Sequence, residues 1–496
     1  MTAQHPDDQH PDDQHPDDQH PDGQHPDDQH PDDGASTALL PSTARLLLAR
    51  TARAQRDSRV PSLVAGVVRG GSLVWSAARG GVSEPHDDVQ YRLGSISKTV
   101  TAITVLRLRD EGLLHLDDRL ELHLPGTPFG DRTIGQLLAH TAGLRSEAPG
   151  PWWERVPGPA WGDLAGQLDP TDVKHDAGRR FHYSNLGYGA LGEVLSRHRG
   201  RAWFEVVRDE VLRPLGMVRT TPRPDGRAAD GWAVHPWADA LLPEPEHDGG
   251  GMAAAGQLWA TLTDLGRLAA FLLGDTGDVL EAATLDEMAL PAGIDSSAKG
   301  WSAYGLGLQV VRSGDATLLG HGGSMPGFLA SVFVDRDQGL GTVVLCNATS
   351  GLDATLVTDL HQTVRTAEPR VVAPWSPCAR LDDDLMALVG VWFWGTSAYG
   401  LRLHADGLLA MSGLVGAGRA SRFRPRGDGT FVGLDGYHAG EVMRVVREDG
   451  RVVALDLGSF VFSRTAYDPD APQPGGVHPD GWRPGPSEAS AEQQQD

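Results

Sequence analysis

The chain has 496 residues and a mass of 52.9 kDa, and its 43 Lys and Arg against 66 Asp and Glu leave a formal net charge of −23. This length predicts two or three domains, with a core large enough to need no disulfide framework. The acidic balance argues against nucleic acid and anionic lipid surfaces as partners, because both attract basic proteins. No apolar run approaches the ~18 residues of a membrane span, so we expect no membrane partner.

Rare residue types carry further information. The two cysteines, Cys346 and Cys378, make neither a disulfide framework nor a zinc site, and the apolar run around Cys346 favours a buried thiol. The first residues lack the basic, apolar and small-residue pattern of a secretory signal, which predicts a cytoplasmic protein if Met1 is the true start. Lysine occurs three times and asparagine twice, so motifs that use them stand out.

The amino-terminal segment 1–34 is predicted to be disordered. Residues 4–33 repeat Gln-His-Pro-Asp-Asp six times, with Gly23 replacing one Asp, and contain nothing apolar to bury. Histidines spaced five apart beside aspartates could bind a divalent metal weakly. The alternative is a solvated acidic tail.

Residues 35–368 are predicted to form one α+β domain. Apolar spacing and turn signals predict helices at 42–55, 95–111, 133–138, 186–198 and 258–273, a hairpin of 62–68 and 72–77, and strands at 304–311, 329–335 and 341–346. Helices in the middle with strands at both ends imply an antiparallel sheet that joins distant parts of the chain.

A second, smaller domain is predicted over residues 382–467, after a Pro-containing linker at 369–381. Four Asp-Gly pairs, at 406–407, 428–429, 435–436 and 449–450, separate short apolar runs. Turn signals at this density are typical of an all-β domain. Residues 468–496, rich in Pro, Gly, Gln and Glu, are predicted to be a disordered tail.

The first candidate for chemistry is Ser95-Ile96-Ser97-Lys98, at the start of a predicted helix. A spacing of three places both polar side chains on one helical face. A serine hydroxyl needs a base to become a nucleophile, and a lysine serves only if its pKa is lowered. A second match, Ser296 to Lys299, precedes no helical pattern and is interpreted as a coincidence in a loop. The alternative for Lys98 is chance placement of one of three lysines.

The second candidate is Tyr183-Ser184-Asn185. A phenol beside a lysine can have its pKa lowered enough to act as a general base. An asparagine amide can hold a substrate carbonyl or amide and orient the lysine. The alternative is a core tyrosine followed by a helix-capping asparagine.

The third candidate is Gly320-His321-Gly322-Gly323-Ser324, placed between predicted strands. Glycines there would let a substrate lie against an edge strand, with the following backbone N–H exposed. His321 would supply a proton donor or a switchable charge. The alternative is a β-turn with an exposed histidine.

The three motifs together resemble the class C β-lactamase-like serine hydrolases, a family that includes β-lactamases, penicillin-binding proteins, esterases and D-aminopeptidases. The resemblance covers about residues 40–365 and extends to the phrases at 91–94, 137–144, 214–217 and 320–328. It implies a β-lactamase/transpeptidase-like fold, an antiparallel sheet flanked by helices plus a helical region. The block at 392–395 and 433–437 resembles a β-rich module found behind such domains in actinobacterial hydrolases.

The resemblance also implies roles for residues. Ser95 would be the acylated nucleophile, Lys98 and Tyr183 would share the proton transfers, and Asn185 would orient the substrate and Lys98. The backbone N–H groups of Ser95 and Ser324 would form the oxyanion hole, and the stretch His321, Gly322, Gly323 and Ser324 would bind substrate.

His321 departs from the family pattern, because a lysine usually stands at this position. A lysine offers fixed charge to a substrate carboxylate, which a neutral histidine does not. Within the family, His-x-Gly resembles esterases and D-amino-acid peptidases more than efficient β-lactamases.

We therefore expect a serine hydrolase that acts through a Ser95 acyl-enzyme on a small ester, amide or short peptide, without cofactor or metal. His140 is expected to be structural and to bond to a nearby loop. The rival interpretation is a catalytically retired binding or scaffold module. The intact set of Ser95, Lys98 and Tyr183 argues against it, since a retired site needs none of the three.

Overall fold

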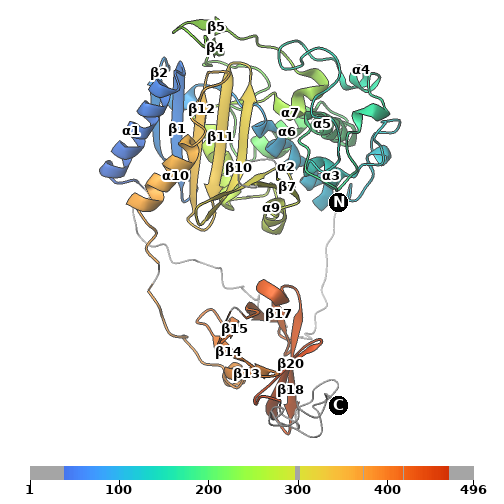
Figure 1. Ribbon diagram of the computed structural model, residues 1–496, viewed down its shortest axis with the longest axis vertical. Coiled ribbons are helices and arrows are strands. Elements are labelled where there is room, and N and C mark those ends of the chain that lie inside the picture. The colour runs from blue at the N-terminus through green and yellow to red at the C-terminus, as the bar shows by residue number, and fades with distance from the viewer. Residues whose placement is uncertain (1–37, 297–301, 373, 417, 468–496) are drawn as a thin grey trace, which may run out of the picture. The chain divides into compact units, whose positions relative to one another are not determined.

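A computed structural model describes residues 38–296, 302–372, 374–416 and 418–467, and the chain divides into two compact units between Arg370 and Val371 (Figure 1). The predicted tails at 1–34 and 468–496, and Lys299 of the second Ser-x-x-Lys, lie outside the described residues. Within the described ranges, no helix is both long and apolar enough to cross a membrane.

The first unit combines one large sheet with a helical region. Its helices are α1 Pro41–Asp57, α2 Ile96–Asp110, α3 Ile134–Leu138, α4 Trp161–Ala165, α5 Asn185–Arg199, α6 Trp203–Val207, α7 Ala253–Gly256, α8 Leu262–Leu273, α9 Ala282–Met288 and α10 Leu356–Ala367. Its sheet strands are β1 Ser62–Arg69, β2 Ser72–Gly80, β7 Gly293–Asp295, β8 Ser302–Tyr304, β9 Gln309–Ser313, β10 Ala316–Met325, β11 Phe328–Asp335 and β12 Leu340–Cys346. Two short pairs, β3 Tyr91–Arg92 with β6 Trp259–Ala260 and β4 Trp232–Val234 with β5 Leu241–Pro243, complete it.

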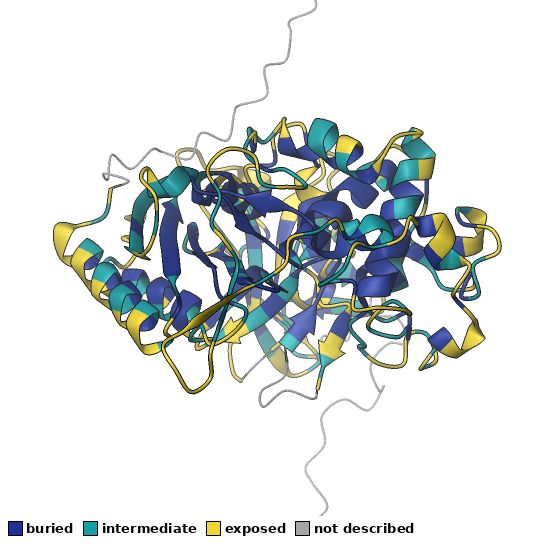
Figure 2. Ribbon diagram, turned by 90° about the horizontal axis from the view of Figure 1, so that it is seen from above, coloured by how far each residue is buried: buried dark blue, intermediate teal, exposed yellow. Residues whose placement is uncertain are grey.

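The sheet is antiparallel throughout, in the order β2-β1-β12-β11-β10-β9-β8-β7. Strand β1 pairs with β12, with Leu63 opposite Cys346, so the predicted joining of distant segments is confirmed. Helices α1 and α10 cover one face and α8 and α2 pack on the other, which explains why β1 and β12 are almost continuously apolar (Figures 1 and 2). Cys346 is fully buried, and burial raises the pKa of its thiol to about 12.

The prediction for the glycine-rich motif was wrong in its local structure. Residues 320–324 do not connect two strands but lie inside the ten-residue strand β10. A Cβ on Gly320 would lie 1.9 Å from the Val332 carbonyl oxygen, and one on Gly323 would lie 1.8 Å from the Leu93 carbonyl oxygen. The glycines are therefore required by close backbone approach, although glycine is poor in strands by propensity.

Two other boundaries differ from the predictions. The strand expected at 304–311 is interrupted at residues 305–308, which separate β8 from β9. The helix expected from 258 begins at Leu262, because Trp259 and Ala260 pair with β3 instead. The helix predicted after Thr133 is confirmed, and Thr133 and Gln136 form a reciprocal capping box.

The second unit is a closed antiparallel barrel, which confirms the predicted all-β domain. Its strands are β13 Gly390–Trp394, β14 Ser397–Leu403, β15 Leu409–Gly413, β16 Ser421–Pro425, β17 Phe431–Gly433, β18 Val442–Glu448, β19 Arg451–Leu457 and β20 Phe460–Ser463, preceded by the short helix α11 Asp383–Met386. Phe393 pairs with Ser463 to close the ring. Trp392 fills the interior, and the Arg464 guanidinium lies 3.7 Å from the centroid of its ring. The four Asp-Gly pairs fall between consecutive strands, as turn signals should.

Candidate active site

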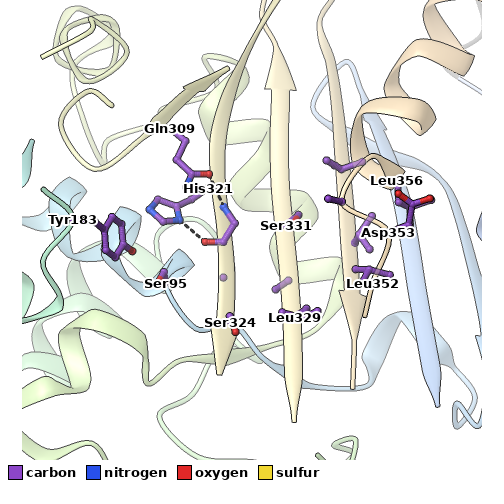
Figure 3. Close-up of a pocket in the computed structure, with 16 residues that line it drawn as sticks. Ser95, Tyr183, Gln309, His321, Ser324, Leu329, Ser331, Leu352, Asp353 and Leu356 are labelled. Carbon is purple, nitrogen blue, oxygen red and sulfur yellow. Dashed lines mark hydrogen bonds between the residues drawn. The ribbon is translucent and has the colours of Figure 1, made fainter. Parts of the chain in front are cut away.

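Ser95 and Lys98 lie at the start of α2, and Ser95 lines a pocket beside strand β10 (Figure 3). The Nζ of Lys98 donates hydrogen bonds to the Oγ of Ser95 at 3.0 Å and to the carbonyl oxygen of Ala255 at 2.7 Å. The lysine side chain is fully buried, and this desolvation lowers its pKa to about 7. The amine is therefore partly neutral at physiological pH, as a general base must be.

Tyr183 lies beside both Ser95 and Lys98, just before α5. Its hydroxyl hydrogen-bonds with Ser95, and the centroid of its ring is 4.9 Å from the Lys98 Nζ. The predicted lowering of the Tyr183 pKa was wrong: burial raises the pKa of the phenol, despite the bond with Ser95. Because the neighbouring amine is only partly charged, it stabilises the phenolate too little to offset burial, so Tyr183 stays protonated and is suited to donate a proton.

Two glycines bring the backbone of β10 against the start of α2. Gly94 has φ +55°, and a Cβ there would lie 2.5 Å from the Ser324 backbone nitrogen. A Cβ on Gly323 would lie 3.0 Å from the Ser95 backbone nitrogen. The N–H groups of Ser95 and Ser324 are thus neighbours, which is the arrangement that an oxyanion hole needs.

His321 is inside the protein rather than exposed in a turn. Its Nδ1 donates to the carbonyl oxygen of Gly322, so its Nε2 accepts from the Tyr304 hydroxyl at 2.9 Å. Burial, together with the charge of Lys98, lowers the pKa of His321 to about 3. With both nitrogens engaged and the ring neutral, His321 supplies neither the proton nor the switchable charge that we expected of it.

Asn185 is held by a carboxylate that the sequence did not indicate. Its Nδ2 donates to both carboxylate oxygens of Glu147, at 2.8 and 3.0 Å, and the indole of Trp153 donates to the same carboxylate at 2.7 Å. Its Oδ1 is buried and has no hydrogen-bond partner among the described residues. Lys98 bonds to Ser95 and Ala255 instead, so the expected Asn185–Lys98 contact is not formed.

His140 bonds to a nearby loop, as expected: its Nδ1 accepts from the Ser184 backbone N–H at 3.1 Å. The imidazole also packs against Tyr183, with ring centroids 4.1 Å apart, and thereby holds the phenol in place. Tyr304 and Gln309, which bond to His321 and to the Gly322 N–H, had no sequence signal of their own. In the described part of the chain, no three His, Cys, Asp or Glu side chains are grouped to hold a metal.

Of the residues described above, Ser95, Tyr183, Gln309 and the β10 stretch 321–324 line one pocket of about 400 Å³, whereas Asn185 does not line it. Figure 3 shows Ser95, Tyr183 and His321 at one end and Leu352, Asp353 and Leu356 at the other. The pocket brings together Ser95, Tyr183 and the β10 stretch 321–324, which are far apart in the sequence. Lys98 lies buried behind Ser95, outside the pocket lining.

Comparison with known proteins agrees with this geometry. The family model described as Beta-lactamase matches residues 48–363, which is more than half of the chain. The chain belongs to the Beta-lactamase family. Its barrel matches a domain of unknown function, DUF7586, over residues 381–464.

Similar proteins carry several different names. The chain is 25% identical over 259 residues to Beta-lactamase-like protein 2 of Dictyostelium discoideum, covering 48% of this chain and 47% of that one. It thus spans about half the length of this curated relative. Among solved structures, a D-stereospecific amidohydrolase from Streptomyces sp. is 26% identical with a TM-score of 0.57, covering 64% of this chain and 97% of that one. An octameric penicillin-binding protein homologue from Pyrococcus abyssi has the same fold, at 20% identity, a TM-score of 0.58 and coverage of 84% and 99%.

Proposed function

We propose that this protein hydrolyses a small ester or amide through an acyl-enzyme on Ser95. The observation that carries the proposal is the 3.0 Å hydrogen bond between Ser95 and a fully buried lysine whose pKa is lowered to about 7. Family membership and the neighbouring N–H groups of Ser95 and Ser324 support it. Together these groups supply what acyl transfer requires, namely a nucleophile, a base, a proton donor and an oxyanion site.

The proton transfers follow from the two altered pKa values. Neutral Lys98 takes the Ser95 proton while Oγ bonds to the carbonyl carbon, and the N–H groups of Ser95 and Ser324 donate to the oxygen that becomes negative. Tyr183 gives its proton to the leaving oxygen or nitrogen, and the Lys98 ammonium, whose Nζ lies 4.9 Å from the centroid of the phenol ring, returns a proton to the phenolate. Water then attacks the ester carbonyl and loses a proton to the pair of neutral Lys98 and Tyr183. The pair returns a proton to the Ser95 oxygen as the bond between it and the acyl carbon breaks, and the acid is released.

The charges around Ser95 favour neutral esters, or amides with a free amine, over substrates with a carboxylate. His321 is neutral where the family pattern has a lysine, and the carboxylates of Glu147 and Glu154 contribute a negative potential at Lys98. The similarity to a D-stereospecific amidohydrolase supports an amide of a D-amino acid as the leading amide substrate. β-Lactam hydrolysis is disfavoured, since it needs a cation for the β-lactam carboxylate.

The test compares wild type with Ser95→Ala on p-nitrophenyl acetate, on D- and L-alaninamide and on a chromogenic β-lactam. Ser296→Ala is the matched control, because Ser296 begins the other Ser-x-x-Lys and is exposed. We expect Ser95→Ala to lower kcat/KM by at least roughly 10³-fold and Ser296→Ala to leave it unchanged. Mass spectrometry of the quenched reaction should find the acyl group on the peptide containing Ser95. Equal rates in wild type and Ser95→Ala, or no turnover of any substrate, would favour the retired binding module.

A further inference from the structure

The pocket continues from Ser95 onto the face of the sheet that α1 and α10 cover, where Val344, Leu356 and Val357 belong to one apolar cluster. Strand β10 pairs with β9 only from Ala316 to Gly320, so its stretch from His321 to Met325 has a backbone ladder with β11 alone, and β9 reaches it only through the side chain of Gln309. Beyond this stretch the pocket lining passes over β11 and β12 and ends at the loop before α10 (Figure 3). We call this extension the chain groove, defined by Gly322, Leu329, Ser331, Val344, Leu352, Leu356 and Val357.

The floor of the chain groove is a row of small and apolar residues. Gly322 lies opposite Ser331, and Ser331 lies opposite Val344, so the row runs straight across three strands. Neighbouring strands are ~4.8 Å apart, so the row is roughly 10 Å long. A Cβ on Gly322 would meet nothing closer than 3.8 Å, so the missing side chain opens the groove rather than relieving a clash.

The far wall of the chain groove is apolar and held in place. Leu352, Leu356 and Val357 form this wall, and Leu356 and Val357 are buried. Asp353 anchors the loop: one carboxylate oxygen accepts from Arg50 at 2.6 Å and the other from the Thr355 N–H at 2.9 Å. A rigid apolar wall at the end of a small-residue floor suits an uncharged chain.

The charges around the chain groove also favour an uncharged occupant. Among the described residues, the lining of the whole pocket contains no lysine or arginine, and its one histidine, His321, has both nitrogens engaged. Its carboxylate, Asp353, is ionised, since bonds from the Thr355 N–H and from Arg50 lower its pKa. An anionic substituent there would be desolvated without a counter-charge, which is costly.

We propose that the chain groove binds an uncharged, apolar substituent of the substrate, such as an aliphatic chain of about eight carbon atoms, and excludes one that ends in a carboxylate. This rests on the proposed function, because the occupant is part of the molecule that Ser95 attacks. The groove thus names the substrate class: an ester or amide with an apolar arm on one side of the scissile bond.

The first experiment measures binding without turnover. The Ser95→Ala protein is titrated calorimetrically with butanamide, octanamide and suberic acid monoamide, which has the length of octanamide and a carboxylate at its far end. Each buried methylene should tighten binding about threefold to fourfold. We expect octanamide to bind at least tenfold more tightly than either other ligand. Equal affinity for butanamide and octanamide, or for octanamide and the monoamide, would overturn the proposal.

Variants in the Ser95→Ala background locate the ligand. Ser331→Phe should fill the middle of the floor and remove the preference for octanamide, whereas Ser331→Ala, the matched control, should keep it. Leu352→Arg is the second variant, on a half-buried loop residue, and should reverse the preference toward the monoamide. Octanamide binding undiminished in a folded Ser331→Phe protein, or no change with Leu352→Arg, would overturn the groove assignment.

Kinetics with wild type separate the two proposals. Series of p-nitrophenyl acyl esters and of alkyl acetates lengthen the substrate on either side of the scissile bond. A rise of kcat/KM with length in one series, abolished by Ser331→Phe, supports the groove. Hydrolysis with no dependence on length in either series would overturn the groove and leave the serine hydrolase standing. Length-dependent binding by Ser95→Ala with no hydrolysis by wild type would support the groove and overturn the proposed hydrolase activity.

Discussion

The Nζ of Lys98 lies 3.0 Å from the Oγ of Ser95, and none of the lysine side chain is exposed to water. In this position the amine loses hydration that would stabilise its charge, and its pKa falls to about 7. In the mechanism that we propose, one buried group therefore governs both the reactivity of Ser95 and part of the pH dependence of stability.

The activity should increase through neutral pH. Only the neutral amine can accept the Ser95 proton, so kcat/KM for p-nitrophenyl acetate should rise with an apparent pKa of about 7. Lys98→Arg should be inactive over the whole range, since a guanidinium does not deprotonate. A profile measured from pH 5 to 10 checks this, and an ascending limb near pH 10 would show that Lys98 is not the base.

Lys98→Met should abolish activity and stabilise the fold. Between the folded pKa of about 7 and the ordinary value of 10.5, the unfolded chain binds more protons, so the stability of wild type rises with pH there. At pH 7 the buried lysine costs on the order of 4 kcal/mol, and removing it should raise Tm by roughly 5–10 °C. Calorimetry of both proteins at pH 7 and pH 10 measures this. The Tm difference should shrink at pH 10, and a difference that grows with pH would contradict the argument.

Glu147→Gln should move the ascending limb of the pH profile toward acid. The negative charge of Glu147 raises the pKa of Lys98 against the larger effect of burial, so removing it lets that pKa fall further. At pH 6 the variant should retain about twice the fraction of its maximal rate that wild type retains. Glu193→Gln, at a half-buried position of α5 where the carboxylate pairs with Arg197, is the control and should leave the profile unchanged. A limb shifted toward alkali would contradict the electrostatic role of Glu147.

Gly94→Ala should damage catalysis through the backbone. The added methyl would push against the Ser324 nitrogen, 2.5 Å away, and separate the two N–H groups of the oxyanion hole. We expect kcat to fall about 10²-fold. Gly112→Ala is a matched control, because Gly112 also has a positive φ, +73°, but a Cβ there meets nothing within 4 Å. It should cost about 1 kcal/mol of stability and no activity. Equal kinetic effects in both variants would attribute the loss to backbone strain alone.

The hydrogen bond between Ser95 and Lys98 was predictable because it is local. Ser95 and Lys98 lie three residues apart on a helix, and helical geometry alone places them together. Tyr183 could be added only through the family resemblance, since nothing within its own motif indicates which residue it faces.

The features that the sequence analysis predicted wrongly, or did not predict, depend on tertiary contacts. Gly320 and Gly323 lower the strand propensity of β10, yet they are there because Val332 and Leu93 approach too closely for a side chain. Glu147 gave no signal because its partner Asn185 is 38 residues away and no spacing rule joins them. The Asp-Gly turns predicted an all-β second unit. They could not predict that the barrel closes, because closure pairs Phe393 in β13 with Ser463 in β20, 70 residues later in the chain.

The pairing of β1 with β12 also sets an order of events on the ribosome. Ser62 donates its backbone N–H to the side chain of Asn347, 285 residues later, at 2.7 Å. At ~5–20 residues per second, the ribosome needs roughly 15–60 s to synthesise the intervening chain. Throughout that time the eight-residue strand β1 has β2 on one side and an unpaired apolar edge on the other. The nascent chain therefore passes through a long aggregation-sensitive interval, in which chaperones that bind extended apolar segments have a defined target, residues 62–69.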